Sequence, residues 1–262
     1  MTYDDNKARS QYRFGRFAAS YVTSDVHRGG ADLDRLIELV QAQPGWTALD
    51  IATGGGHTAL RLAPLVSWVV AADLTLTMLA AAREYLTAQA VTNIQYVTTD
   101  AERLAFASET YDLVTCRIAP HHFPDCFRFV LECARVLNPG GLLVIEDHLL
   151  PDDERAARYI DAFERLRDPS HHRAFSAYEW RGMLLDAGLE VEHMETMARR
   201  GMRLIPWAER QGCEPAVIER LQIMLAQAPS GVRAFMQPRC IGTVDAEFDH
   251  QYILLVGRKP SS

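Results

Sequence analysis

The chain lacks three features that would have restricted its class of function. Its 262 residues contain no apolar run of membrane-spanning length, since the longest runs, such as Gly141–Ile145, are only as long as a strand. The N-terminus is polar, without the apolar core of a signal peptide, and the five cysteines form no CxxC pair, so we expect a protein of a reducing compartment, the cytoplasm. The formal net charge of −7 disfavours a nucleic-acid partner, because an acidic surface repels phosphate.

Strand-like and helix-like segments alternate along the first 150 residues. This order favours an α/β fold, in which a parallel sheet carries helices on both faces. Apolar residues make up 48% of the chain, which is enough for a sizeable core without disulfides or metal. The expected strands are 46–51, 67–72, 94–98, 111–118, 142–148, 189–197 and 251–257, and the expected helices are 31–43, 58–65, 75–90, 125–137, 152–167, 178–187 and 203–237.

We expect residues 1–262 to form one domain with four parts. Residues 1–30, which are dotted with aromatic side chains, are interpreted as an N-terminal lid, and residues 31–150 as a cofactor-binding core. The alternation loosens after residue 150. Residues 151–237 are therefore interpreted as helical cap insertions that include strand six, and residues 238–262 as the last strand. No Gly/Ser-rich linker marks an independent second domain.

The strongest local signal is a glycine-rich turn between a buried strand and a helix, in the segment Leu49–Ala59. The pattern Gly54-x-Gly56-x-x-Ala59 satisfies the dinucleotide fingerprint, so a nicotinamide cofactor is one interpretation. Asp50 favours another, because a carboxylate here helps to repel a pyrophosphate. It suits a ligand that carries an ammonium group, as S-adenosylmethionine does.

Asp73 ends the second expected strand. An acid at this place accepts hydrogen bonds from ribose hydroxyls, and both cofactors predict it. The alternative is a structural role as the N-cap of the next helix.

Five segments, in the right order, resemble the class I S-adenosylmethionine-dependent methyltransferases. The similarity is to the ubiquinone/menaquinone-biosynthesis type (methyltransferase type 11-like) and its small-molecule relatives, and it covers residues 10 to 150 well. Two departures stand out: Ala52 replaces the first glycine of the family's first motif, and Thr98-Thr99 replaces the glycine before Asp100. The five segments are Leu49–Ala59, Asp73-Leu74, Thr99–Phe106, Tyr111–Arg117 and Arg135–Gly141.

The resemblance implies a Rossmann-like, seven-stranded, mostly parallel sheet with a helical cap. The last strand, 251–257, is expected to insert antiparallel beside the sixth. The family's residue after the second-motif acid lies against adenine, and the acid of its "GDAExLPF" stretch binds the adenine amino group. With the N-terminal aromatic segment as a lid, the predicted cofactor-binding residues are Tyr21, His27, Asp50, Ala52, Thr53, Gly54, Gly56, Asp73, Leu74, Met78, Asp100, Ala101, Glu102 and Arg117.

Methyl transfer needs little acid–base machinery, because alignment of the reactants supplies most of the catalysis. If a base is used, the candidates are His121 and His122, which follow the fourth expected strand, and Asp147 and His148, which end the fifth, at the edge where such sheets bind ligands. A structural, hydrogen-bonded role is the alternative for each histidine. We expect no metal, because the histidine-bearing segments lie far apart in the sequence and show no metal-binding spacing.

The function we predict is methyl transfer from S-adenosylmethionine to C, O or N of a small, partly apolar acceptor. The only partner expected is this acceptor, although a homodimer is compatible with the composition. Two alternatives stay open: an NAD(P)-dependent oxidoreductase, which would share the glycine turn, and a protein that binds S-adenosylmethionine without catalysis. The fold hosts many functions and does not choose the acceptor.

Overall fold

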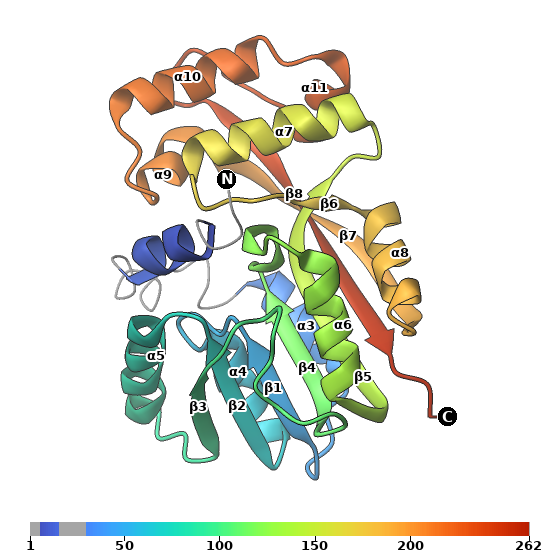
Figure 1. Ribbon diagram of the computed structural model, residues 1–262. Coiled ribbons are helices and arrows are strands. Elements are labelled where there is room, and N and C mark those ends of the chain that lie inside the picture. Colours follow the sequence, from blue (N-terminus) through green and yellow to red (C-terminus); the bar gives the residue numbers. More distant parts are fainter. Residues whose placement is uncertain (1–5, 16–29, 262) are drawn as a thin grey trace.

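The computed structural model describes residues 6–15 and 30–261, and its centre is one twisted sheet (Figure 1). Within this part of the chain the sheet has eight strands, in the order β3-β2-β1-β4-β5-β8-β7, with β6 paired to β5. Five strands, β1 to β5, run parallel, as the alternating pattern predicts. Their bounds are Thr47–Ile51 (β1), Trp68–Asp73 (β2), Ile94–Thr98 (β3), Tyr111–Arg117 (β4) and Leu137–Leu150 (β5).

Helices cover both faces of the parallel strands. Alternate strand residues face opposite sides, so Ala48 packs with one set of helices and Leu49 with the other. The first set is α3 (Ala31–Val40), α4 (His57–Leu62) and α5 (Leu76–Ala88), and the second is α6 (Cys126–Val136) and α8 (Ala177–Asp186). Short 3-10 turns, η1 (Ala63–Leu65) and η2 (Pro120–His122), follow α4 and β4.

The last two long strands confirm the expected topology. β8 (Glu247–Arg258) lies between β5 and β7 (Glu190–Arg203) and is antiparallel to both. The expected number of seven strands is one too low, because the two-residue strand β6 (Phe175–Ser176) pairs with the end of β5. A two-residue strand has no periodicity that the sequence could reveal.

A helical cap stands above the carboxyl ends of the parallel strands (Figure 1). It consists of α7 (Glu154–Arg167), α9 (Leu204–Glu209), α10 (Pro215–Ala226) and α11 (Ser230–Met236), so the expected helical stretch 203–237 is three helices. Gly212, with φ of 68°, and Pro229 lie at the two breaks. The cap has its own apolar cluster, which includes Phe163, Trp207 and Phe248. Because Phe248 belongs to β8, the sheet extends into the cap and supports it.

Residues 6–15 form a helix beside α5, within the segment 1–30 that the sequence analysis interprets as an N-terminal lid. The other residues of that segment, including the predicted cofactor contacts Tyr21 and His27, lie outside the described part of the chain. Within the described residues, every helix is too short or too polar to cross a bilayer.

Aromatic stacking holds the cap cluster together. The rings of Phe163 and Trp207 stack with centroids 5.3 Å apart, and Phe163 is fully buried. Replacing Phe163 by alanine should lower the free energy of unfolding by about 3–5 kcal/mol, because the lost burial leaves a cavity. Tyr178→Ala is the control: this side chain is 79% exposed, and its loss should change stability by less than about 0.5 kcal/mol. If Phe163→Ala and Tyr178→Ala lowered the free energy of unfolding in urea by the same amount, the packing role of Phe163 would be contradicted.

The turn between β1 and α4 requires glycine at one position for two reasons. Gly56 has φ of 82°, and a Cβ there would lie 2.8 Å from Cδ1 of Leu86 on α5. We therefore expect Gly56→Ala to lower the free energy of unfolding by about 1–3 kcal/mol. Gly182→Ala is the matched control, because that helical glycine has open space around it and alanine should stabilise by roughly 0.5–1 kcal/mol. Chemical unfolding of both variants measures the difference, and a Gly56→Ala variant as stable as the wild type would contradict it.

Candidate functional site

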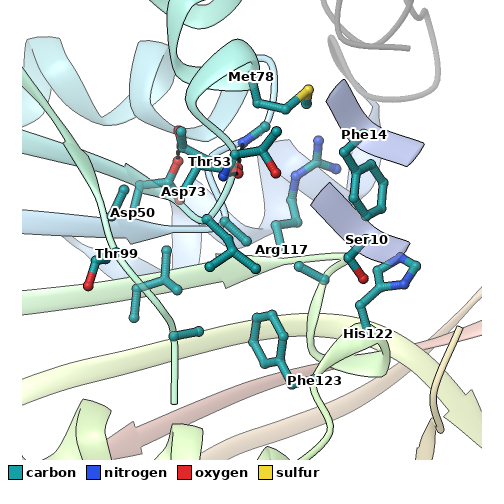
Figure 2. A pocket seen from close by; sticks show the side chains of 18 of the residues that line it. Ser10, Phe14, Asp50, Thr53, Asp73, Met78, Thr99, Arg117, His122 and Phe123 are labelled. Atoms are coloured by element: carbon teal, nitrogen blue, oxygen red, sulfur yellow. Dashed lines mark hydrogen bonds between the residues drawn. The ribbon is translucent and has the colours of Figure 1, made fainter. Parts of the chain in front are cut away.

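One pocket lies at the carboxyl ends of β1, β2 and β4, where open α/β sheets bind ligands (Figure 2). It encloses about 1090 Å³, including space open to solvent. The loops after these strands form its floor and η2 forms one wall. The helix of residues 6–15 closes it from outside with Lys7, Ser10 and Phe14.

Most of the sequence-predicted site residues meet in this pocket. Gly56 lies in the turn behind the lining, and His121 and His148 lie behind the wall formed by η2. The helix contributes Lys7 and Ser10, which sequence reasoning missed, since neither belongs to a recognisable motif. The predicted residues that line the pocket are Asp50, Ala52, Thr53, Gly54, Asp73, Leu74, Met78, Asp100, Ala101, Glu102, Arg117 and His122.

The glycine-rich turn is held in a left-handed backbone conformation. Gly54 has φ of 55°, and Ala52, at the position of the family's first glycine, has φ of 52°. Alanine in this region costs about 1–2 kcal/mol, so the departure at Ala52 carries a strain that glycine would not. The amide of Thr53 donates to the carbonyl of Ala72 at 2.9 Å, which ties the turn to β2.

Asp73 fastens this turn to the loop after β2. Its Oδ2 accepts from the Gly54 amide at 3.1 Å and its Oδ1 from the Thr75 amide at 2.8 Å. Burial raises the pKa of Asp73, against the lowering effect of these amide hydrogen bonds. The alternative prediction, that Asp73 is the N-cap residue of the next helix, is wrong, because the N-cap residue of α5 is Thr75. The carboxylate is a buried anion that still lines the pocket.

Asp50 lies beneath the turn and is almost fully buried. Its two oxygens accept hydrogen bonds from the hydroxyls of Thr53, at 2.6 Å, and Thr115, at 2.8 Å. Burial raises the pKa of Asp50 to about 6, while the two hydroxyls oppose this shift. Asp50 therefore supports the turn as well as lining the pocket.

A second acidic group lies at the end of β3. Lys7 of the N-terminal helix donates to Asp100 Oδ2 at 2.6 Å and also pairs with Glu102. The Glu102 amide donates to Asp100 Oδ1 at 3.0 Å, while Glu102 Oε1 accepts from the amide of Asp125 at 2.6 Å. These contacts connect the acidic loop to both the N-terminal helix and the start of α6.

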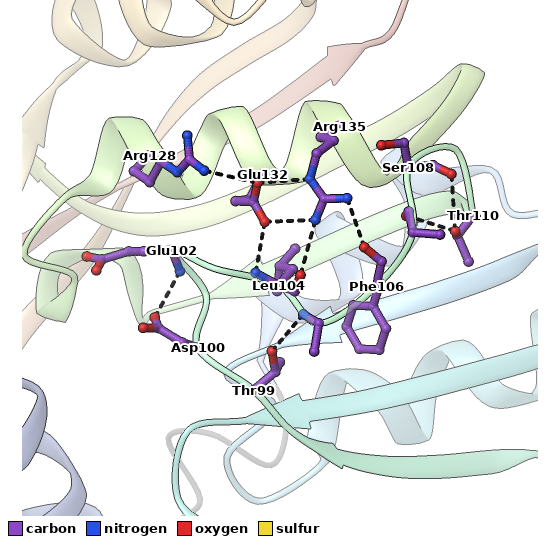
Figure 3. Close-up of polar contacts among 12 residues, drawn as sticks. Thr99, Asp100, Glu102, Leu104, Phe106, Ser108, Thr110, Arg128, Glu132 and Arg135 are labelled. Atoms are coloured by element: carbon purple, nitrogen blue, oxygen red, sulfur yellow. Dashed lines mark hydrogen bonds and ion pairs between the residues drawn. The ribbon is translucent and has the colours of Figure 1, made fainter.

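The rest of the acidic loop is anchored to α6 (Figure 3). Glu132 accepts from the Leu104 amide at 2.9 Å, and Arg135 donates to the carbonyl of Leu104 at 3.1 Å and to that of Phe106 at 2.8 Å. Glu132 and Arg135 also pair with each other. These contacts fix the loop that carries Asp100 to α6.

Arg117 ends β4 at the side of the pocket. Its guanidinium pairs with Asp32 of α3 at 2.9 Å and lies 3.7 Å from Glu146. Asp112, at the other end of β4, accepts hydrogen bonds from the Thr47 amide and the Asn138 side chain.

His122 is the one candidate base that reaches the pocket. Its Nδ1 lies 3.0 Å from the carbonyl of Ser170, which can only accept, so this nitrogen carries the proton and Nε2 has a free lone pair. The ring meets Phe14 edge-on, with centroids 4.9 Å apart. Burial lowers the pKa of His122 to about 3, so the imidazole is neutral and a weak base at pH 7.

The other two histidines belong to a buried cluster behind the pocket wall. The rings of His121 and His148 stack with centroids 4.0 Å apart, and His171 and His250 adjoin them. Burial lowers the pKa of His121 to about 3 and holds the pKa of His148 well below its usual value. The expectation of no metal rested on the distance between these segments in the sequence, and the fold brings them together.

Comparison with known proteins agrees with this site. Residues 49–145 match the family described as a methyltransferase domain. The uncharacterized methyltransferase YcgJ of Bacillus subtilis is 36% identical over 65% of this chain and 67% of its own. The ubiquinone/menaquinone biosynthesis C-methyltransferase UbiE of Ectopseudomonas mendocina is 36% identical, over 57% of this chain and 62% of its own.

A solved structure extends the similarity to the cap. The crystal structure of BH2331 from Bacillus halodurans, named there as a candidate methyltransferase, superposes with a TM-score of 0.83 at 33% identity. The match covers 88% of this chain and 100% of that one. The nicotinamide alternative gains no support from any of these relatives. The chain belongs to the class I S-adenosylmethionine-dependent methyltransferases.

Proposed function

We propose that this chain binds S-adenosylmethionine in the pocket at the carboxyl ends of β1, β2 and β4 and transfers its methyl group to a small, partly apolar acceptor. One observation carries the proposal. The glycine turn, Asp73 and Asp100 line the same pocket as His122 and Phe123. Figure 2 shows Thr53 of the turn and Asp73 across the pocket from His122 and Phe123. The pocket therefore has a polar end for a cofactor and a largely apolar end for an acceptor.

The charges along the pocket fit this cofactor. Asp50, Asp73, Asp100 and Glu102 all line it. The two cations at its edge are already paired: Arg117 with Asp32, and Lys7 with Asp100 and Glu102. A surplus of carboxylates favours a ligand with ammonium and sulfonium charges and repels a pyrophosphate.

Each part of the polar end has a separate task. The amides of the glycine turn at the N-terminus of α4 suit the carboxylate of the amino acid moiety, because helix N-termini bind anions. Asp73 is placed to accept hydrogen bonds from the ribose hydroxyls, and the loop that carries Asp100 is placed to bind the adenine amino group. The corresponding acids have these roles in the family that the sequence resembles. When bound, S-adenosylmethionine supplies a methyl group on a positively charged sulfur, which is a good leaving group.

The protein's contribution to transfer is alignment and the exclusion of water. Alignment of two bound reactants lowers a barrier by roughly 7–11 kcal/mol. Phe14 and Phe123 make the acceptor end apolar, and Nε2 of His122 accepts a hydrogen bond from a hydroxyl or N–H of the acceptor. With a pKa of about 3, His122 orients the acceptor and adds little as a base.

Loss of the Asp73 carboxylate should weaken cofactor binding. We expect Asp73→Ala to lower the affinity for S-adenosylmethionine and S-adenosylhomocysteine at least tenfold, because it removes the acceptor for the ribose hydroxyls. Asp112→Ala is the matched control, because Asp112 also accepts two hydrogen bonds but lies at the opposite end of the sheet. The affinity of this variant for both ligands should equal that of the wild type.

Calorimetry and thermal unfolding with each ligand, and with NADH as a negative control, measure these affinities. Wild-type protein at about 100 times the dissociation constant should gain about 2.7 kcal/mol of stability. Stabilisation by NADH alone, or unchanged affinity in Asp73→Ala, would be incompatible with the proposed site.

Loss of the His122 imidazole should affect turnover and not cofactor binding. We expect His122→Ala to lower the rate of S-adenosylhomocysteine formation across a panel of small hydroxylated aromatic acceptors, with the affinity for S-adenosylmethionine unchanged. His193→Ala on β7 serves as the control, since His193 pairs with Glu195 away from the pocket. A His122→Ala enzyme with wild-type turnover would assign this ring to packing. Cofactor binding without any turnover in the wild type would favour a binding protein over an enzyme.

A further inference from the structure

Four histidines from four separate segments meet in the interior between the sheet and the cap. His121 comes from η2, His148 from the end of β5, His171 from the loop after α7 and His250 from β8. All four side chains are buried, with 4 to 8% of their surface exposed. A buried cluster of imidazoles is costly unless their nitrogens have partners, so each nitrogen needs an explanation.

Two of these rings are oriented by a carboxylate on one nitrogen only. His121 Nδ1 lies 2.5 Å from Asp147, and His171 Nε2 lies 2.8 Å from Asp161. In each case the opposite nitrogen makes no hydrogen bond to the described residues. Metal-binding histidines commonly have such a contact, in which the ring nitrogen that does not bind the ion donates to a carboxylate that fixes the ring and makes the ligand more basic.

The third ring adds a nitrogen without a partner. His148 Nδ1 is buried and has no hydrogen-bond partner within the described part of the chain. His121, His148 and His171 each offer one ring nitrogen, and these three nitrogens all lie within 4.8 Å of one another.

A competing set shares His148. His148, Glu164 and His250 also lie within 4.8 Å of one another. In that set, however, His250 Nε2 and Glu164 Oε1 already form a hydrogen bond of 2.7 Å, so a metal ion would have to break an existing pair. The first set has no such internal bond among its ligand atoms.

We propose that His121, His148 and His171 form a binding site for a divalent transition-metal ion, with zinc as the ion of best fit. Three imidazoles and an open fourth position are a ligand set that zinc accepts, while calcium and magnesium require oxygen ligands. The ion would join β5 and η2 of the core to the loop after α7 in the cap. It would also brace the pocket wall, because the ring of His121 lies 4.1 Å from that of His122. The proposal rests on this cluster alone and is independent of the proposed methyl transfer.

The test is zinc binding by the full chain after treatment with a chelator. We expect one zinc ion per chain in calorimetry, and visible absorption typical of a tetrahedral site when cobalt replaces zinc. His171→Gln should reduce zinc affinity by more than the roughly 10–100-fold that loss of a carboxylate partner costs, and Asp161→Asn should fall within that range. His250→Gln is the matched control from the same cluster and should bind zinc as the wild type does.

Thermal unfolding with and without chelator separates loss of the site from loss of the fold. Zinc should raise the melting temperature of the wild type and of His250→Gln, and have little effect on His171→Gln. Absence of stoichiometric zinc in the wild type would overturn the proposal. Full zinc affinity in His171→Gln would also overturn it, and so would loss of zinc in His250→Gln alone, which would assign the ion to the competing set.

Discussion

The carboxylate of Asp73 connects the two parts of the chain on which the pocket depends. It ends β2, yet it accepts hydrogen bonds from the glycine turn after β1 and from the loop before α5. This tie adds to the hydrogen bond between the Thr53 amide and the Ala72 carbonyl in offsetting the strain of the turn's left-handed backbone. Asp50 supports the same turn from below through Thr53. Two buried acids therefore hold the turn in shape, and each costs free energy of desolvation that its hydrogen bonds offset.

The cap depends on the sheet in a different way. β5, β7 and β8 continue past the core, and residues at the cap end of β8, such as Phe248, pack among the cap helices. The cap therefore shares the rigidity of the sheet and needs no separate domain boundary. This geometry also explains why the histidine cluster is buried: His250 on β8 contacts Glu164 of α7, and His148 on β5 lies beside His171 of the loop after α7.

Different interactions form the two ends of the pocket. At the cofactor end, charged groups are paired or bound to amides, and these contacts within the protein fix their positions. At the acceptor end, apolar side chains and one neutral imidazole give shape with few polar requirements. A fixed polar end and a permissive apolar end suit a family whose members share a cofactor and differ in acceptor.

The sequence by itself determined the parallel core and most of the cofactor end. Alternating strands and helices have strong local periodicity, and the glycine turn, Asp73 and Asp100 lie in motifs within a few residues of strand ends. The short strand β6, the breaks between the cap helices and the roles of Lys7 and Ser10 left no such local pattern. Only the tertiary structure decided which histidine reaches the pocket and that His121, His148 and His171 meet. These residues are separated by 27 and 23 positions along the chain. Their proximity arises from strand pairing and cap packing, which are long-range contacts that periodicity does not encode.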